Sequence, residues 1–298
     1  MSVKPSVAVV VASLGRPAEV EALLHRLAQQ SLLPTRVILS VESVADLPVS
    51  LQQNWPFPLD TILGPRGSSI QRNRALDRLA GQVDLVAILD DDYVPSIHAL
   101  DGISRSFAAF PEASGLCGTL LADGADSMGI QLQEALRMVS TYDAEQGPVT
   151  APSRVVGMKG VYGCNMAFRM ADVGALRFDE NVPLYGWLED SDFGARLPGP
   201  VIYTNAWVGV HCAVKTGREA RGRRLGYSQV MNPVYFWRKG SMSLGRILPL
   251  MLRPILANTA KSLRPEPWVD RKGRLQGNFL ALMDLLRGRI TPGRILSL

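Results

Sequence analysis

The sequence predicts an α/β protein whose doubly wound, mostly parallel sheet carries helices on both faces. Short, continuous apolar runs such as Val7–Ala12 and Leu85–Leu89 are typical of strands buried on both faces of a sheet. Between such runs, apolar residues recur at three- and four-residue spacing, which is the pattern of an amphipathic helix. Strands that alternate with helices form parallel sheets, because each crossover places a helix on one face.

The first part of the chain supplies most of this alternation. The strand Val7–Ala12 ends before Pro17, which suits the first turn of a helix. Val37–Val41 is a second strand, and a serine at 68 or 69 caps a second helix ahead of the strand Leu85–Leu89. The remaining expected elements are a short strand at 61–63, a helix at 97–110, a strand at 115–121, a helix within 130–144, a strand at 201–210 and helices at 246–263 and 278–290.

Composition and charge indicate a globular protein with a basic end. The chain has 298 residues, of which 47% are hydrophobic, so it can bury a sizeable core. The net charge of +5 is uneven, because residues 1–212 hold 15 basic and 23 acidic residues, and residues 213–298 hold 17 basic and 4 acidic residues. We therefore expect a domain at 1–212 and a basic helical region at 213–298, which suits an anionic partner.

Cysteine usage and hydropathy predict a cytoplasmic protein. Cys117, Cys164 and Cys212 show neither metal-ligand spacing nor a disulfide framework, which fits a reducing compartment. The first residues enter a strand and lack the features of a signal peptide. No uncharged apolar stretch reaches the length of a transmembrane helix.

Three consecutive aspartates, Asp90, Asp91 and Asp92, follow the strand Leu85–Leu89 and are the strongest indication of a functional site. Open α/β sheets bind ligands at the carboxyl ends of their strands, where this triplet is expected to lie. Adjacent carboxylates repel one another, and a divalent cation with oxygen ligands is the counter-charge that such groups bind. A solvated acidic turn before Pro95 is the alternative.

Other polar residues indicate the rest of a site, each with a plainer alternative. Glu189 and Asp190 follow a loop rich in glycine and aromatic residues, and a helix start there would keep them ionised, so either could act as a general base. Ordinary placement of acids at a helix start is the alternative. Arg72 near a helix start would be favourable beside an anion, but it could be a solvated surface residue. His211 ends a strand and could bind a metal or be structural.

Five segments along the chain form an ordered set, namely Val7–Arg16, Ile70–Leu76, Leu89–Pro95, Gly163–Arg169 and Phe178–Phe193. In this order they are similar to an opening strand with a polar-x-x-Arg turn, an Ala-Arg-Asn-x-Gly-Leu segment, an Asp-x-Asp metal motif, an acceptor-side Gly-x-Asn-x-x-Phe-Arg segment and a Glu-Asp motif. The set resembles that of family 2 glycosyltransferases, the inverting nucleotide-sugar enzymes of the GT-A fold. The resemblance covers about residues 6–212.

This resemblance implies a GT-A-like domain and a metal-dependent inverting glycosyltransferase. Asp92, with Asp90 and His211, would bind Mg²⁺ or Mn²⁺ and, through the cation, the donor diphosphate. Asp190 would deprotonate the acceptor hydroxyl, and Glu189 is the second candidate for this base.

The resemblance also implies residues that bind the donor, which is expected to be a nucleotide sugar and first of all a UDP-sugar. Ser13, Arg16 and Arg72 would surround the nucleotide, and Asp91 would shape the turn or touch the ribose. One departure concerns the nucleobase. Many relatives have Val-Asp-Asp-Gly-Ser after the second strand, whereas this chain has Ser-Val-Glu-Ser, so Glu42 could replace the aspartate with a longer reach.

The acceptor expected from the resemblance is a glycan or a lipid-linked sugar, in polysaccharide or glycoconjugate synthesis. The apolar and basic helix at 246–263 predicts peripheral contact with an anionic membrane at its inner face, and helices packed on the catalytic domain are the alternative. No nucleic-acid partner is expected. Two other functions stay open. One is a sugar nucleotidyltransferase, which should carry a longer phosphate loop than Ser13–Arg16, and the other is a non-catalytic relative that binds membrane or nucleic acid.

Overall fold

The computed structural model describes residues 4–158, 160–213 and 222–298, and its internal contacts divide the chain into two units. The first, the sheet unit, comprises Met1–Arg66, Ile70–Arg177 and Leu197–Val214. The second, the helical unit, comprises Gly67–Ser69, Phe178–Arg196 and Lys215–Leu298. The acidic segment around residue 190 therefore belongs to the same unit as the C-terminal helices. The boundary expected from the sequence, between residues 212 and 213, placed this segment with the sheet instead.

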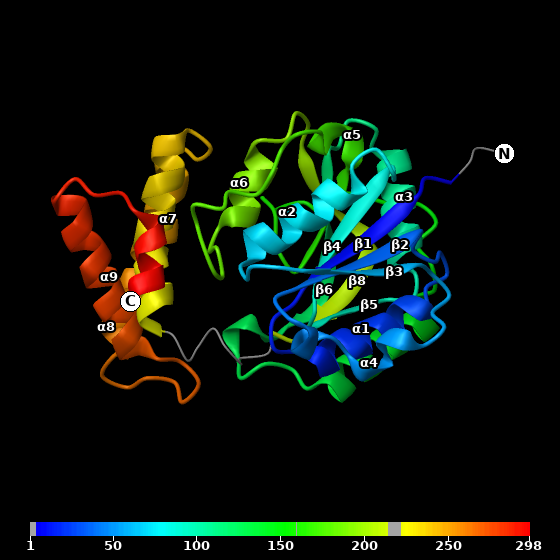
Figure 1. Ribbon diagram of the computed structural model, residues 1–298, viewed down its shortest axis with the longest axis horizontal. Coiled ribbons are helices and arrows are strands. Elements are labelled where there is room, and N and C mark those ends of the chain that lie inside the picture. Colours follow the sequence, from blue (N-terminus) through cyan, green and yellow to red (C-terminus); the bar gives the residue numbers. More distant parts are fainter. Residues whose placement is uncertain (1–3, 159, 214–221) are drawn as a thin grey trace. The chain divides into compact units, whose positions relative to one another are not determined.

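In the described part of the chain, the sheet unit contains one eight-stranded sheet (Figure 1). Its strands are β1 (Val7–Ala12), β2 (Arg36–Val41), β3 (Leu59–Leu63), β4 (Leu85–Asp90), β5 (Tyr93–Pro95), β6 (Gly115–Asp123), β7 (Asn165–Arg169) and β8 (Val201–His211), in the spatial order β3-β2-β1-β4-β7-β6-β8-β5. Parallel pairs join β3, β2, β1 and β4, and also β6 and β8, whereas β7 is antiparallel to both neighbours and β5 is antiparallel to β8. The predicted α/β class with a mostly parallel sheet is confirmed.

Alternation along β1 explains why helices cover both faces of this sheet. The helices here are α1 (Pro17–Ala28), α2 (Ser68–Leu79), α3 (Ala99–Ala109), α4 (Leu132–Gln146) and α5 (Met170–Val173). Val9 and Val11 share a buried cluster with Leu24 of α1 and Ile103 of α3. Successive side chains of a strand point to opposite faces, and α2 lies across the sheet from α1 (Figure 1). Each fully buried leucine or isoleucine contributes about 1.5–3 kcal/mol to stability.

Strand pairing brings three strand ends to one edge of the sheet. β7 is antiparallel to both β4 and β6, so these two strands run in the same direction, and β8 runs parallel to β6. Asp90, Asp123 and His211 end these three strands, and Asp123 is paired in register with His211. The short strand β5, which sequence analysis did not predict, places Tyr93 opposite His211 and leaves the next two aspartates of the triplet in the turn between β4 and β5.

The helical unit packs three long helices around a core of its own. Its helices are α6 (Glu189–Ala195), α7 (Gly222–Lys239), α8 (Leu244–Lys261) and α9 (Arg271–Leu286). A Cβ atom at Gly226 of α7 or at Gly277 of α9 would collide with a backbone carbonyl oxygen of the other helix, so these glycines permit the close approach. The two expected C-terminal helices are present as α8 and α9, whereas α7 was not predicted. Among the described helices, none combines the length and the apolar character needed to cross a bilayer.

Candidate active site

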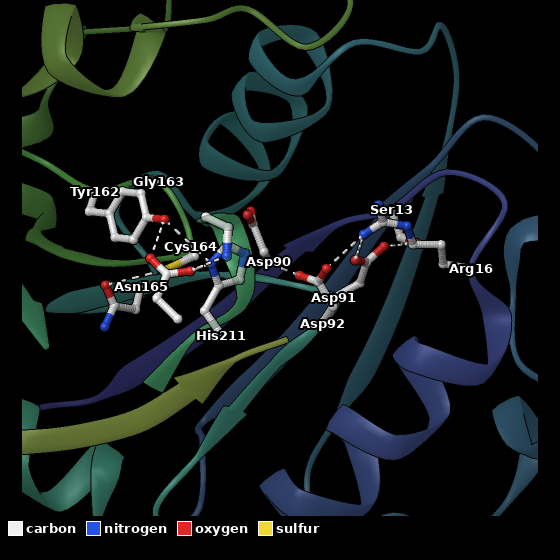
Figure 2. A network of polar contacts seen from close by, with 12 residues as sticks. Ser13, Arg16, Asp90, Asp91, Asp92, Tyr162, Gly163, Cys164, Asn165 and His211 are labelled. Carbon is white, nitrogen blue, oxygen red and sulfur yellow. Dashed lines mark hydrogen bonds and ion pairs between the residues drawn. The ribbon is translucent and has the colours of Figure 1, made fainter. Parts of the chain in front are cut away.

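A cluster of two carboxylates and one histidine lies at the edge where β4 and β8 end (Figure 2). Ligand atoms of Asp90, Asp92 and His211 all lie within 4.8 Å of one another, and His211 Nε2 is 3.6 Å from Asp92 Oδ1. Asp92 and His211 are buried, but the Asp90 side chain is 36% exposed, so the cluster can be reached from solvent at Asp90. Oxygen and imidazole donors in this arrangement could hold a divalent metal ion.

Asp91 faces away from this cluster and anchors the turn that follows β1. Ser13 Oγ donates a hydrogen bond to Asp91 Oδ2 at 2.6 Å, and Arg16 Nη1 lies 2.8 Å from Asp91 Oδ1 and 3.1 Å from Asp92 Oδ2. Figure 2 shows Ser13 and Arg16 on one side of the aspartates and His211 on the other. Burial, opposed by the charge of Arg16, raises the pKa of Asp91 to about 7. The contacts of Asp91 with Ser13 and Arg16 help to hold the guanidinium group beside Asp92.

Arg72, on α2, supplies a second positive charge. Its Nη2 atom lies 3.1 Å from Asp90 Oδ1 and 3.4 Å from the carbonyl oxygen of Gly163. Partial desolvation of its carboxylate raises the pKa of Asp90, the charge of Arg72 opposes this shift, and the charge of Asp92 adds to it. Because Arg72 is only 5% exposed, the alternative of a solvated surface arginine is wrong.

Two residues that sequence analysis missed orient His211. Its Nδ1 atom is 2.9 Å from Asp123 Oδ1, and Tyr162 donates a hydrogen bond to Asp123 Oδ2 at 2.7 Å. Because a carboxylate engages Nδ1, Nε2 is the nitrogen that faces Asp92. Against the opposing effect of burial, the hydrogen bond to Asp123 and the charge of Asp92 raise the pKa of His211. Extending the expected strand by two residues would have placed Asp123 at this edge of the sheet.

A buried carboxylate, Asp46, ties the turn after β1 to the loop after β2. It accepts hydrogen bonds from the backbone N–H groups of Gly15 at 2.7 Å and Ser43 at 2.9 Å. Gly15 has a φ of +69°, a left-handed conformation that favours glycine. Glu42 in the same loop lies 4.0 Å from Arg66, and both side chains are more than 40% exposed. The contact of Glu42 with a nucleobase stays a prediction.

The second acidic segment lies in the helical unit and forms the short helix α6. Glu189 is buried and Asp190 is half-buried, and Asp190 Oδ1 accepts a hydrogen bond from the Ser191 N–H at 2.6 Å. The preceding loop contains Leu184 with a φ of +62° and Leu188 with a φ of +73°. A left-handed conformation is uncommon outside glycine and persists only where the surrounding structure enforces it. The expected helix start at these acids is confirmed, and their catalytic role stays a prediction.

Comparison with solved structures identifies the fold. No protein-family model matches the sequence, and no curated protein matches it. Residues 1–349 of TarS from S. aureus match with a TM-score of 0.58 at 13% identity, over 97% of this chain and 82% of that chain. The same part of TarS in complex with UDP-GlcNAc matches with a TM-score of 0.54 at 15% identity, over 97% and 82%. The mannosyltransferase PcManGT from Pyrobaculum calidifontis, in complex with GDP-Man and Mn²⁺, matches with a TM-score of 0.53 at 16% identity, over 96% and 83%.

These likenesses extend over both units of the chain, since each covers nearly all of its residues. They agree with the mixed, mostly parallel sheet and the C-terminal helices described above. TM-scores of 0.53–0.58 at identities of 13–16% show a shared fold. The protein therefore has the GT-A-like α/β fold that its five sequence segments predicted.

Proposed function

We propose that the protein is a metal-dependent, inverting glycosyltransferase that moves a sugar from a nucleotide-sugar donor to a hydroxyl group of an acceptor. The observation that carries this proposal is the cluster of Asp90, Asp92 and His211 at the carboxyl edge of a GT-A-like sheet. Solved structures of this fold hold UDP-GlcNAc in one case, and GDP-Man with Mn²⁺ in another. Both contain a nucleotide sugar, so a donor of this class is the best-supported ligand.

The residues of the sheet unit fit the donor half of this reaction. Asp90, Asp92 and His211 would hold the cation, which when bound neutralises the charge that develops on the leaving nucleoside diphosphate. Carboxylates suit both Mg²⁺ and Mn²⁺, but imidazole is a transition-metal ligand, so we favour Mn²⁺. Arg72 is buried and Arg16 is half-buried beside these carboxylates, and both would face the diphosphate, since a guanidinium group can donate two parallel hydrogen bonds to phosphate oxygens.

Asp190 is the proposed base, with Glu189 as the second candidate. Its carboxylate would accept the proton of the acceptor hydroxyl while the hydroxyl oxygen attacks the anomeric carbon. The new C–O bond forms on the face opposite the leaving group, and the bond between the anomeric carbon and the diphosphate oxygen breaks with its electron pair. A single displacement of this kind inverts the anomeric configuration.

A panel of nucleotide sugars tests the proposed function. Each donor is added with and without Mn²⁺, and thermal stability and donor hydrolysis are recorded. We expect one class of donor, first of all a UDP-sugar, to raise the melting temperature only when Mn²⁺ is present, because binding to the folded state stabilises it by mass action. Absence of stabilisation by every donor would contradict the proposal. Release of pyrophosphate from a nucleoside triphosphate and a sugar 1-phosphate would instead indicate the nucleotidyltransferase.

We further propose that the helical unit binds the cytoplasmic face of an anionic membrane, where the protein would encounter a glycan or lipid-linked acceptor. Helix α8 carries no acidic residue, and Arg253 is exposed on it. Leucines and arginines on one helix suit the bilayer interface, and each basic residue near anionic lipid contributes about 1 kcal/mol. The exposed leucines of α8 recur at every fourth position and are called the leucine stripe, which comprises Leu244, Leu248, Leu252 and Leu256.

Replacing Leu252 and Leu256 together with glutamine is expected to weaken vesicle binding about tenfold, since each CH₂ group buried in the bilayer contributes about 0.8 kcal/mol. Co-sedimentation with phosphatidylcholine vesicles, with and without phosphatidylglycerol, measures this effect. The matched control replaces Leu33 and Leu63, which are 42% and 50% exposed in the sheet unit. Equal binding by both variants would refute the membrane proposal. If the wild type and the control variant are dimers and only the stripe variant is a monomer, the leucine stripe is instead the contact surface for a second copy of the chain.

A further inference from the structure

Helix α7 holds the loop that leads to the proposed base. Asn232 Nδ2 donates a hydrogen bond to the carbonyl oxygen of Trp187 at 2.9 Å, and Tyr235 Oη donates one to Asp179 Oδ2 at 3.0 Å. Lys239, the last residue of α7, lies 2.6 Å from the same oxygen of Asp179. These three side chains recur about one helical turn apart and fasten the segment 178–196 along the helix.

The contact at Asp192 ties α7 directly to α6. Lys239 Nζ lies 2.8 Å from Asp192 Oδ2, so the ammonium group bridges the carboxylates of Asp179 and Asp192. Asp192 is fully buried, and Arg196 Nη2 also lies 2.8 Å from its Oδ2 atom. A buried carboxylate is tolerated where cations and hydrogen bonds compensate it, and loss of one partner is strongly destabilising.

The short helix α6 needs such outside support. It has seven residues, far fewer than an isolated helix needs in water. The rings of Phe178 and Phe193 stack 4.1 Å apart on one side of the segment, and their packing adds to the polar contacts. The left-handed conformations of Leu184 and Leu188 also require a surrounding structure that enforces them. The hydrogen bond from Asn232 to the carbonyl oxygen of Trp187, the residue before Leu188, is one contact of α7 that contributes to this support.

We propose that Lys239, assisted by Asn232, is a positioning residue that sets the place of the base carried by α6. The proposal rests on the proposed function, because it takes Asp190 or Glu189 as the base. It assigns a positioning role to the C-terminal basic region, in which a lysine outside the acidic segment fixes the geometry of that segment. Lys239 would act on the transfer step and not on the binding of the donor, whose proposed ligands lie in the sheet unit.

The test compares Lys239→Met with Lys239→Arg. Methionine keeps an unbranched apolar chain but lacks the charge, and we expect kcat to fall about 100-fold, because a displacement of about 1 Å can cost that much. The dissociation constant of the donor, measured by calorimetry, should stay within about twofold of the wild-type value. Lys239→Arg should recover most of the rate, since arginine can still pair with both carboxylates.

Amide hydrogen exchange supplies a readout that does not depend on activity. The backbone N–H groups of Glu189 and Asp192 donate hydrogen bonds to carbonyl oxygens within the segment 186–193. In Lys239→Met these bonds should open more often, so the amides of this segment should exchange faster. Lys261→Met is the matched control, since Lys261 is 54% exposed and pairs with Glu266 at 2.6 Å in the same unit. If Lys239→Met does not fold, Asn232→Leu tests the same set of contacts, called here the clamp, which joins Asn232, Tyr235 and Lys239 of α7 to the segment 178–196.

The outcomes separate this inference from the proposed function. Unchanged kcat and unchanged exchange in Lys239→Met would overturn the positioning role, and so would a loss of donor affinity that parallels the loss of rate. If the wild-type protein transfers no sugar, the proposed function is wrong. Faster exchange in Lys239→Met would then show that the clamp supports the segment 186–193, although this segment does not carry a base for sugar transfer.

Discussion

Replacing Asp92 with alanine is expected to remove Mn²⁺-dependent binding of the donor. Asp92 is buried, and its carboxylate lies 3.6 Å from His211 Nε2 and 3.1 Å from Arg16 Nη1, so alanine would remove one of the three proposed metal ligands. Loss of an outer partner of a metal ligand typically costs 10- to 100-fold in metal affinity, and loss of a ligand itself should exceed about 100-fold. Isothermal titration calorimetry with the donor, in the presence and absence of Mn²⁺, measures the change.

Two further variants make the Asp92 result specific. Asp123→Asn keeps the shape of the residue but weakens its hold on His211 Nδ1, so the affinity for Mn²⁺ should fall about 10- to 100-fold, less than in Asp92→Ala. Asp77→Ala, whose side chain is 65% exposed beside Arg177, should leave the affinity unchanged. If Mn²⁺ does not change the donor affinity of the wild type, and does not change that of Asp92→Ala either, the proposed function does not require a metal ion.

Replacing Asp190 with asparagine is expected to abolish transfer while donor binding stays largely intact. Asparagine preserves the size of the side chain and can still accept the hydrogen bond from the Ser191 N–H, so α6 should keep its start. It cannot take up a proton from the acceptor, and the loss of a general base costs about 100- to 10,000-fold in rate. Steady-state turnover and calorimetry of the donor measure the two effects separately.

Glu189→Gln identifies the base when it is compared with Asp190→Asn. Glu189 is buried and Asp190 is half-buried, so Asp190 is the carboxylate with more access to an acceptor. We expect the larger loss of rate in Asp190→Asn. The reverse order would move the role to Glu189, and near-normal turnover in both variants would reject the segment as the source of the base.

Long elements with a clear period were predictable from the sequence. The strands β1 and β4 and the helix α1 appear as expected, because continuous apolar runs and three- and four-residue spacing both report burial directly. The strand β5 has three residues, too few for any periodicity to show. Helix α7 was missed because it contains Pro233, which usually breaks a helix, and because its buried residues include the polar Gln229 and Asn232, which obscure an apolar stripe.

The candidate site was predictable where its residues follow buried strands. Asp90 and Asp92 were indicated by their place after a buried strand, at the sheet edge where ligands bind, and His211 joined them through the resemblance to family 2 glycosyltransferases. Asp123 and Tyr162 were not, since a single carboxylate or phenol in a sequence does not show which ring it will contact. Lys239 was counted only as part of a basic region, although its partners lie 47 and 60 positions earlier in the chain.

Sequence patterns alone predicted the α/β class, the strand that delivers the aspartate triplet to the sheet edge, and the acids that begin α6. Local patterns suffice for these features, because burial and helix geometry act over a few neighbouring residues. The partners of each aspartate became evident from the folded structure. Asp91 turns to Ser13 and Arg16 while Asp92 faces His211, and the acidic segment around residue 190 joins the C-terminal helices. Those outcomes depend on contacts between residues far apart in the chain, which strand pairing and helix packing create.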